Sequence, residues 1–121
     1  MMRRFNAIRV AAWSFAAAGI YGLVATLSLY TRAPLTADTQ WLYGFAGAAA
    51  ATQLAYLLIA TDPVRYRAVI PIGVVSKLSF AIPMTILFAH DQVPVASLVF
   101  AGIDYALAAL FAMWFVILGR R

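Results

Sequence analysis

The sequence contains no cysteine and no glutamate, and its only acidic residues are four aspartates. Without cysteine the chain has no disulfide, no thiolate metal site and no thiol redox chemistry. Charged residues make up 11% of the chain and hydrophobic residues 65%, against about 25% and 45–50% in soluble domains. This composition excludes a soluble enzyme domain, a secreted disulfide scaffold and a disordered tail. It indicates an integral membrane protein.

The hydrophobic pattern predicts four membrane-spanning helices. Such a helix takes about 20 residues, so a chain of 121 residues can hold four with short loops. Apolar runs cover about residues 8–30, 40–60, 66–89 and 95–118, and Pro34, Pro63 and Pro94 lie between them. The first run is longer than the roughly 7–15 apolar residues of a signal peptide. We therefore expect an all-α membrane protein in which residues 1–121 form a single four-transmembrane-helix bundle.

The distribution of arginine predicts the orientation of these helices. Arg32, with Asp38 and Asp91, falls on one side of the predicted membrane, and all other arginines fall on the opposite side. These are Arg3, Arg4, Arg9, Arg65, Arg67, Arg120 and Arg121. Because cytoplasmic loops carry the excess of positive charge, both termini are expected in the cytoplasm. We expect a multi-pass protein of the bacterial inner (plasma) membrane that attracts anionic lipid headgroups at these arginines and binds no nucleic acid.

Two ionisable residues lie inside the predicted spans, Lys77 in the third and Asp104 in the fourth. Lys77 is about 16 Å from the cytoplasmic end of its helix, and Asp104 is about 13 Å from the outer end of its helix. In a core about 30 Å thick these depths coincide. Since either charge alone would cost about 2.5–3.5 kcal/mol in the membrane, we predict an intramembrane ion pair between Lys77 and Asp104.

The ion pair has two interpretations. It either fixes the register of the third and fourth helices, or it acts directly in transport or ligand binding. Tyr21 and Gln53 in the first two helices are further polar side chains inside the bilayer, and Ser76 and Tyr105 adjoin the pair. Tyr21 and Gln53 are each expected to form an interhelical hydrogen bond. The alternative is that they line a small polar pocket together with the ion pair and its neighbours Ser76 and Tyr105.

Small residues and prolines predict features of packing. Gly19 and Gly22 in the first helix, with glycines and alanines in the second, favour close packing of these two helices or, alternatively, a homodimer face. Pro71 and Pro83 in the third helix each remove a backbone donor, and a kink is expected at both.

Enzyme motifs are absent from the sequence. It contains one histidine, His90, beside Asp91 in a predicted turn, whereas a metal site normally takes three or four ligands. It has no glycine-rich phosphate loop, nucleophile elbow or pair of catalytic carboxylates. We expect no enzyme activity, no cofactor and no bound metal.

The C-terminal half carries a resemblance to a known group of proteins. The residues concerned are Thr61-Asp62-Pro63-Val64-Arg65-Tyr66-Arg67, then Gly73 and Lys77, then Gly102-Ile103-Asp104 with Leu110-Phe111. This half resembles the small four-helix bacterial membrane proteins around the DoxX-like families, which implies an inner-membrane location and a role beside a partner complex. Small multidrug resistance transporters also have four helices, but they carry a glutamate in the first helix that this chain lacks.

Two functions remain after these exclusions. The first is a non-enzymatic inner-membrane accessory or assembly protein within a larger membrane complex. The alternative is a small proton-coupled transporter or channel subunit, as a homodimer, in which Lys77 and Asp104 couple movement to protonation.

Overall fold

The computed structural model describes residues 2–120, and this part of the chain is helical without any strand. The α-helices are α1 (Met2–Leu27), α2 (Gln40–Thr61), α3 (Ile70–Ala89) and α4 (Val95–Gly119). Short 3₁₀ helices at Ser28–Thr31, Ala37–Thr39 and Arg67–Val69 lie at the ends of α1, α2 and α3. All four helices, taken with these 3₁₀ extensions, are long and apolar enough to cross a membrane.

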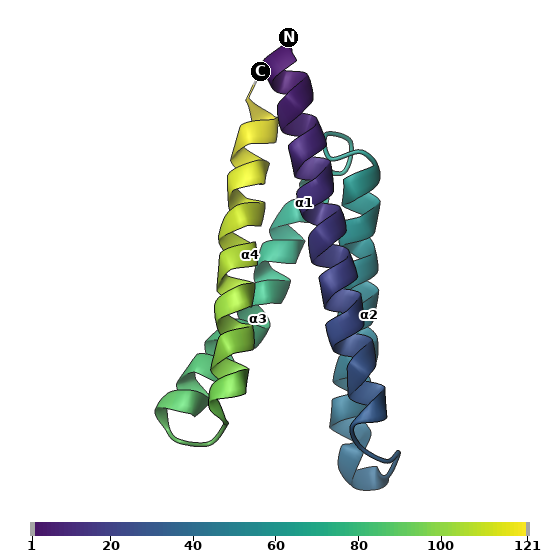
Figure 1. The fold of residues 1–121 in the computed structure, drawn as a ribbon, viewed down its shortest axis with the longest axis vertical. Helices are drawn as coiled ribbons and strands as arrows, with labels where there is room; N and C mark the ends of the chain where they lie inside the picture. Colours follow the sequence, from purple (N-terminus) through teal and green to yellow (C-terminus); the bar gives the residue numbers. More distant parts are fainter. Residues whose placement is uncertain (1, 121) are drawn as a thin grey trace. The chain divides into compact units, whose positions relative to one another are not determined.

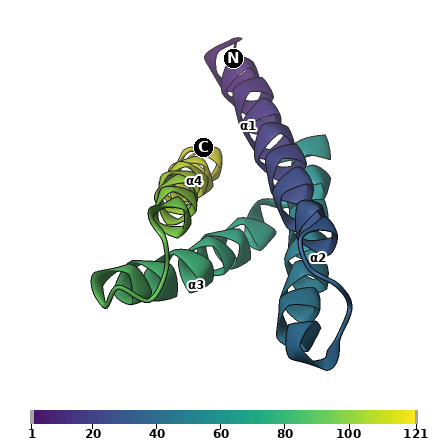
Figure 2. The same ribbon diagram turned by 60° about the horizontal axis from the view of Figure 1, so that its bottom comes forward.

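The helices form two antiparallel hairpins. The contacts divide the chain after Tyr66 into two compact units. In the first, α1 packs against α2, and in the second, α3 packs against α4 (Figure 1). A tight turn joins α3 to α4, and a longer loop joins α1 to α2 (Figure 2). The prediction that the four helices make one domain stays a prediction.

The helix ends differ from the predicted ones most clearly in α1, which begins at Met2 rather than near residue 8. The arginines at positions 3 and 4 end the apolar run, but arginine is a good helix former and no proline or glycine interrupts the segment. Hydrophobicity therefore marked only part of α1, and the helix continues through the two arginines because arginine is a good helix former. The predicted cytoplasmic Arg121 lies outside the described residues.

The expected kink at Pro71 is wrong. The third helix was predicted to begin at about residue 66, but α3 begins at Ile70, and Pro71 therefore lies in its first turn. Backbone N–H groups in the first turn have no partner within the helix, so proline is tolerated there. Pro83 does lie inside α3, where its ring removes one backbone hydrogen bond.

The outer surface of the hairpins carries many large apolar side chains. Trp13, near the middle of α1, is 71% exposed. Val24, near the end of α1, is 68% exposed, and Ile72, near the start of α3, is 66% exposed. A water-soluble monomer rarely exposes apolar side chains over such an area, whereas lipid-facing helix surfaces consist of them. The surface thus agrees with the length and composition of the four helices in indicating a multi-pass membrane protein.

The packing of α1 against α2 depends on two glycines of α1. A Cβ atom at Gly19 would lie 2.7 Å from Leu57 Cδ2, and one at Gly22 would overlap the side chain of Gln53. No larger residue fits at either position without a shift of its neighbour. The predicted close packing of the first two helices is confirmed, because glycine lets the side chains of α2 lie directly on the backbone of α1.

Candidate functional site

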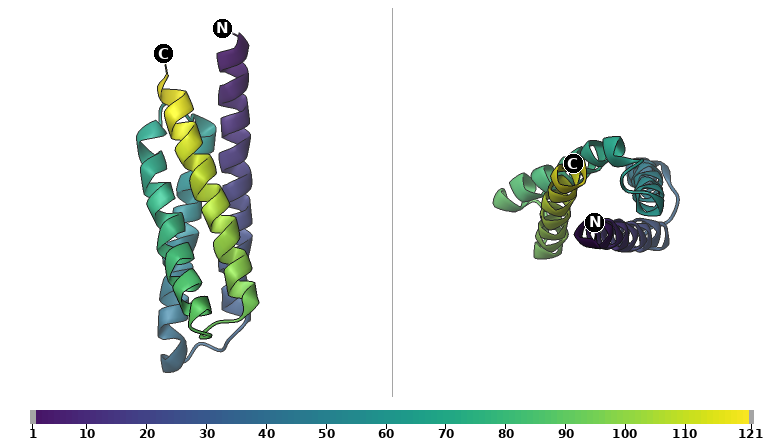
Figure 3. Two further views of the ribbon diagram at one scale, coloured as in Figure 1. Left: turned by 90° about the vertical axis from the view of Figure 1, so that its left-hand side faces the viewer. Right: turned by 90° about the horizontal axis from the view of Figure 1, so that it is seen from above.

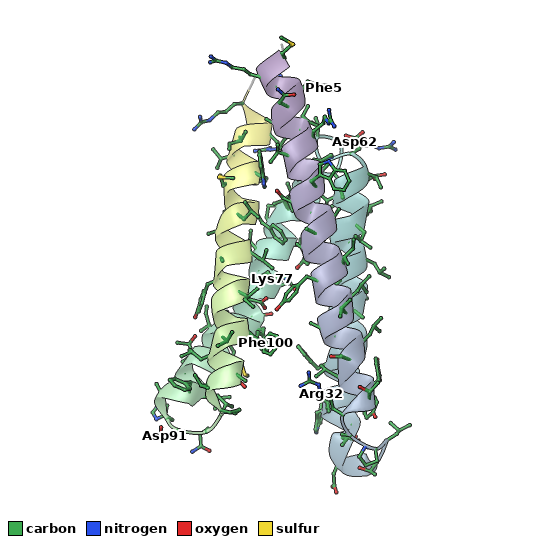
Figure 4. The ribbon with its side chains drawn as sticks, viewed as in Figure 1. Phe5, Arg32, Asp62, Lys77, Asp91 and Phe100 are labelled. Carbon is green, nitrogen blue, oxygen red and sulfur yellow. The ribbon has the colours of Figure 1, made fainter. Side chains whose placement is uncertain are left out.

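Lys77 and Asp104 lie between α3 and α4, inside the second hairpin. The turn after Ala89 sends α4 back along α3, and the two helices run side by side (Figure 3). Lys77 lies about halfway along α3, and Asp91 marks the turn at the end of the hairpin (Figure 4). The structure brings the two charged groups together, with Lys77 Nζ 3.6 Å from Asp104 Oδ1.

Small residues around the pair allow the two helices to approach. On α3, Gly73 and Ala81 lie one turn before and after Lys77, and both are buried. On α4, Ala101 lies three residues before Asp104 and Ala108 four residues after it, and both are also buried. Residues three and four apart share one face of a helix, so this spacing builds a flat contact face with the two charges at its centre.

Burial makes the pair energetically important. The Lys77 side chain is 5% exposed and the Asp104 side chain 15%. A charge in a low-dielectric environment is strongly unfavourable unless an opposite charge lies beside it, and here each group supplies that charge to the other. The distance of 3.6 Å is longer than the roughly 2.7–2.9 Å of a charge-assisted hydrogen bond, so the attraction is that of an ion pair at close range.

Ser76 and Tyr105, the predicted neighbours of the pair, form hydrogen bonds with residues outside the pair. The Tyr105 hydroxyl lies 3.0 Å from Thr85 Oγ1 on α3, and this is a second polar link across the hairpin. Ser76 is half-buried, and its carbonyl accepts a hydrogen bond of 2.7 Å from Ser79 Oγ. Thr85 was not among the predicted residues. Its position eight residues, or about two turns, after Lys77 on the same helix could have indicated that it faces α4.

Tyr21 and Gln53 belong to the first hairpin. Gln53 is buried, and its side-chain amide donates a hydrogen bond of 3.1 Å to the Ala49 carbonyl of the same helix. Its side chain also rests on Gly22 of α1. Tyr21 is half-buried. The proposed polar pocket needs residues of both hairpins, Tyr21 and Gln53 from one and Ser76 and Tyr105 from the other, and it stays a prediction.

Arg67 forms a cluster that the sequence did not indicate. Its Nε donates a hydrogen bond of 2.7 Å to the Phe115 carbonyl, and its Cζ lies 3.9 Å from the centroid of the Phe115 ring. The guanidinium also fills the space beside Gly119. In the sequence Arg67 indicates only the orientation of the helices, because its contacts join positions 48 residues apart.

No group of three or more His, Cys, Asp or Glu side chains suited to a metal ion occurs within residues 2–120. His90 lies in the turn between α3 and α4, where its carbonyl accepts a hydrogen bond of 3.2 Å from Gln92 Nε2.

Comparison of the chain with protein-family models, with curated proteins and with solved structures gave no match.

Proposed function

We propose that this chain is a non-enzymatic, multi-pass protein of a bacterial inner membrane that serves as an accessory or assembly partner of a larger membrane complex. Both termini face the cytoplasm in this proposal, and the arginines on that side attract anionic lipid headgroups. The resemblance of the C-terminal half to the DoxX-like group points in the same direction and is part of the proposal.

One observation carries this proposal: the two charges inside the spans are directed at each other within one hairpin. Lys77 Nζ and Asp104 Oδ1 are 3.6 Å apart, and both side chains are largely buried. A pair of this kind fixes the register of α3 against α4, because sliding one helix by a turn would offset the two charges by about 5 Å along the helix axis. It is the arrangement expected of a rigid structural element.

The second candidate, a proton-coupled transporter or channel subunit, has a different observation in its favour. Asp104 is 15% exposed, three times the exposed fraction of Lys77, and its Oδ1 lies 3.6 Å from Lys77 Nζ, which is longer than a charge-assisted hydrogen bond. A carboxylate held in this way keeps capacity to accept a proton or a hydrogen bond from another donor. This candidate requires that the pair separates during transport.

The test compares Lys77→Met, Asp104→Asn and the double variant in the host membrane. Each single variant leaves one charge unpaired, and we expect its accumulation to fall severalfold because breaking a buried pair costs about 3–5 kcal/mol. The double variant removes both charges, so accumulation is expected to return. Co-purification in mild detergent then reports whether the double variant still binds the same large partner as the wild-type chain.

The two functions predict different results for the double variant. If the pair is structural, the double variant recovers accumulation and partner binding together. If wild-type chain in vesicles shows pH-dependent flux, and the double variant accumulates fully but loses that flux, the accessory function is wrong and the transporter is supported.

A further inference from the structure

Arg67 lies at one end of the α3–α4 hairpin, with its side chain against α4. It precedes α3 in the chain and lies beside the last turn of α4. Its Nε is hydrogen-bonded to the Phe115 carbonyl at 2.7 Å, and its guanidinium lies against the Phe115 ring at 3.9 Å. A cation near the C-terminal end of a helix also interacts favourably with the helix dipole. These contacts join α3 to α4 and fix the guanidinium in place.

Gly119 provides the space that the guanidinium occupies. A Cβ atom at position 119 would lie 2.6 Å from Arg67 Cζ and 2.9 Å from Nε, closer than Cβ atoms approach other atoms in proteins. Any other residue at position 119 would therefore force the guanidinium to shift. Arg67, Phe115 and Gly119 together form what we name the arginine seat.

The arginine seat leaves donors of Arg67 available for an anion. A guanidinium has five N–H donors, and the hydrogen bond to Phe115 uses only the one on Nε. Among residues 2–120 no carboxylate lies within ion-pair distance of Arg67. A second cation, the exposed Arg120, directly follows Gly119 in the chain. A planar guanidinium with unused donors matches the geometry of a phosphate group.

The position of the arginine seat indicates where this phosphate comes from. Arg67 is the first residue of one candidate membrane span, Arg67–Ala89, and Gly119 is the last residue of another, Val95–Gly119. Both therefore fall at the boundary between hydrocarbon and headgroups, where phospholipid phosphates lie. We propose that the arginine seat, with Arg120, binds the phosphate of an anionic phospholipid. This inference rests on the proposed membrane insertion and refines it, since it assigns one arginine a defined lipid site.

The experiment measures lipid retention by the full chain in mild detergent. Dioleoyl phosphatidylglycerol is added as the probe, dioleoyl phosphatidylcholine as the zwitterionic comparison, and bound lipids are counted by native mass spectrometry. We expect Arg67→Lys and Gly119→Leu to lower phosphatidylglycerol retention about tenfold, the factor that corresponds to the loss of one hydrogen bond to a charged group, because each variant loses the planar contact of the guanidinium with the phosphate while keeping the positive charge. Gly119→Leu keeps every cation, so its effect cannot come from net charge.

Matched controls separate the arginine seat from general attraction of charge. Arg4→Lys changes an exposed arginine near the other terminus, and Gly44→Leu changes a glycine with nothing within 4 Å of an added Cβ. Both are expected to retain phosphatidylglycerol like the wild type. Far-UV circular dichroism and gel filtration select folded variants, and Arg67→Lys tests the proposal independently where Gly119→Leu does not fold.

Three results would overturn the proposal. The first is equal retention by the wild type, Arg67→Lys and folded Gly119→Leu. The second is equal retention of phosphatidylcholine and phosphatidylglycerol by the wild type. The third is displacement of phosphatidylglycerol by millimolar inorganic phosphate, which would assign the site to a free anion. None of these results depends on Lys77 or Asp104, so failure of the lipid site is distinguishable from failure of the accessory function.

Discussion

Asp91 shows how a single residue closes the α3–α4 hairpin. It has a φ of 56°, in the left-handed region that suits glycine, and it directly follows His90, the C-cap residue of α3. Its N–H donates to the Phe88 carbonyl at 3.0 Å, and the Gln92 N–H donates to the Leu87 carbonyl at 2.9 Å. These two hydrogen bonds define a Schellman motif, in which carbonyls at the end of a helix are satisfied by the following turn.

The residue Asp91 is therefore less favourable than glycine at this position. We predict that Asp91→Gly raises the free energy of unfolding by about 0.5–1 kcal/mol, because glycine adopts positive φ without steric cost. The measurement is unfolding in mixed detergent micelles with increasing dodecyl sulfate, followed by circular dichroism. Asp91→Ala is the control and is expected to lower stability. Equal stability of all three chains would show that the left-handed conformation costs nothing here.

At the scale of elements, the α1–α2 hairpin depends on where its glycines lie. A Cβ at Gly22 would overlap the Gln53 side chain, whereas a Cβ at Gly44 would meet nothing within 4 Å. Both residues lie inside helices and both belong to the same hairpin. The sequence shows them as equivalent small residues, and only the structure distinguishes the one in the contact from the one outside it.

We predict opposite effects of Gly22→Ala and Gly44→Ala. The first should lower the free energy of unfolding by about 1–3 kcal/mol, because overpacking displaces Gln53. The second should leave stability unchanged or raise it by up to about 1 kcal/mol, because alanine is the better helix former. The same micelle titration measures both. Adding Gln53→Ala to Gly22→Ala should recover part of the loss, and absence of any recovery would place the strain elsewhere.

At the scale of the whole molecule, the absence of cysteine allows a direct test of topology. Single cysteines are introduced at Asn6 near the N-terminus and at Val64 between α2 and α3, both on the side predicted to be cytoplasmic. Two more are introduced at Asp38 between α1 and α2 and at Gln92 between α3 and α4, both on the opposite side. With both termini in the cytoplasm, Asp38→Cys and Gln92→Cys should react with a membrane-impermeant maleimide in intact cells. Asn6→Cys and Val64→Cys should react only after permeabilisation.

The unmodified chain is the background control for this labelling, since it has no thiol. The reverse labelling pattern would mean that the arginine distribution does not orient this protein. Labelling of Asp38→Cys and Gln92→Cys from different sides would mean that the four helices do not cross the membrane in alternation.

Much of the fold could be predicted because hydrophobic length and charge are local properties of the chain. The four segments follow from runs of about 20 apolar residues, and the ends of α2 and α4 lie within a residue of the predicted ones. The start of α1 and the place of Pro71 could not be predicted in this way. Helix ends depend on backbone hydrogen bonds and caps, which hydrophobicity does not report.

The sequence also placed Lys77 and Asp104 at one depth, because rise per residue in a helix is constant and a short turn forces the next helix to run antiparallel. Only the tertiary structure decided which side chains meet: Tyr105 with Thr85, Gln53 with Gly22, and Arg67 with Phe115 and Gly119. Those contacts depend on rotation of each helix about its axis and on side-chain direction. Neither is fixed by the hydrophobic pattern of helices that are apolar on nearly all sides.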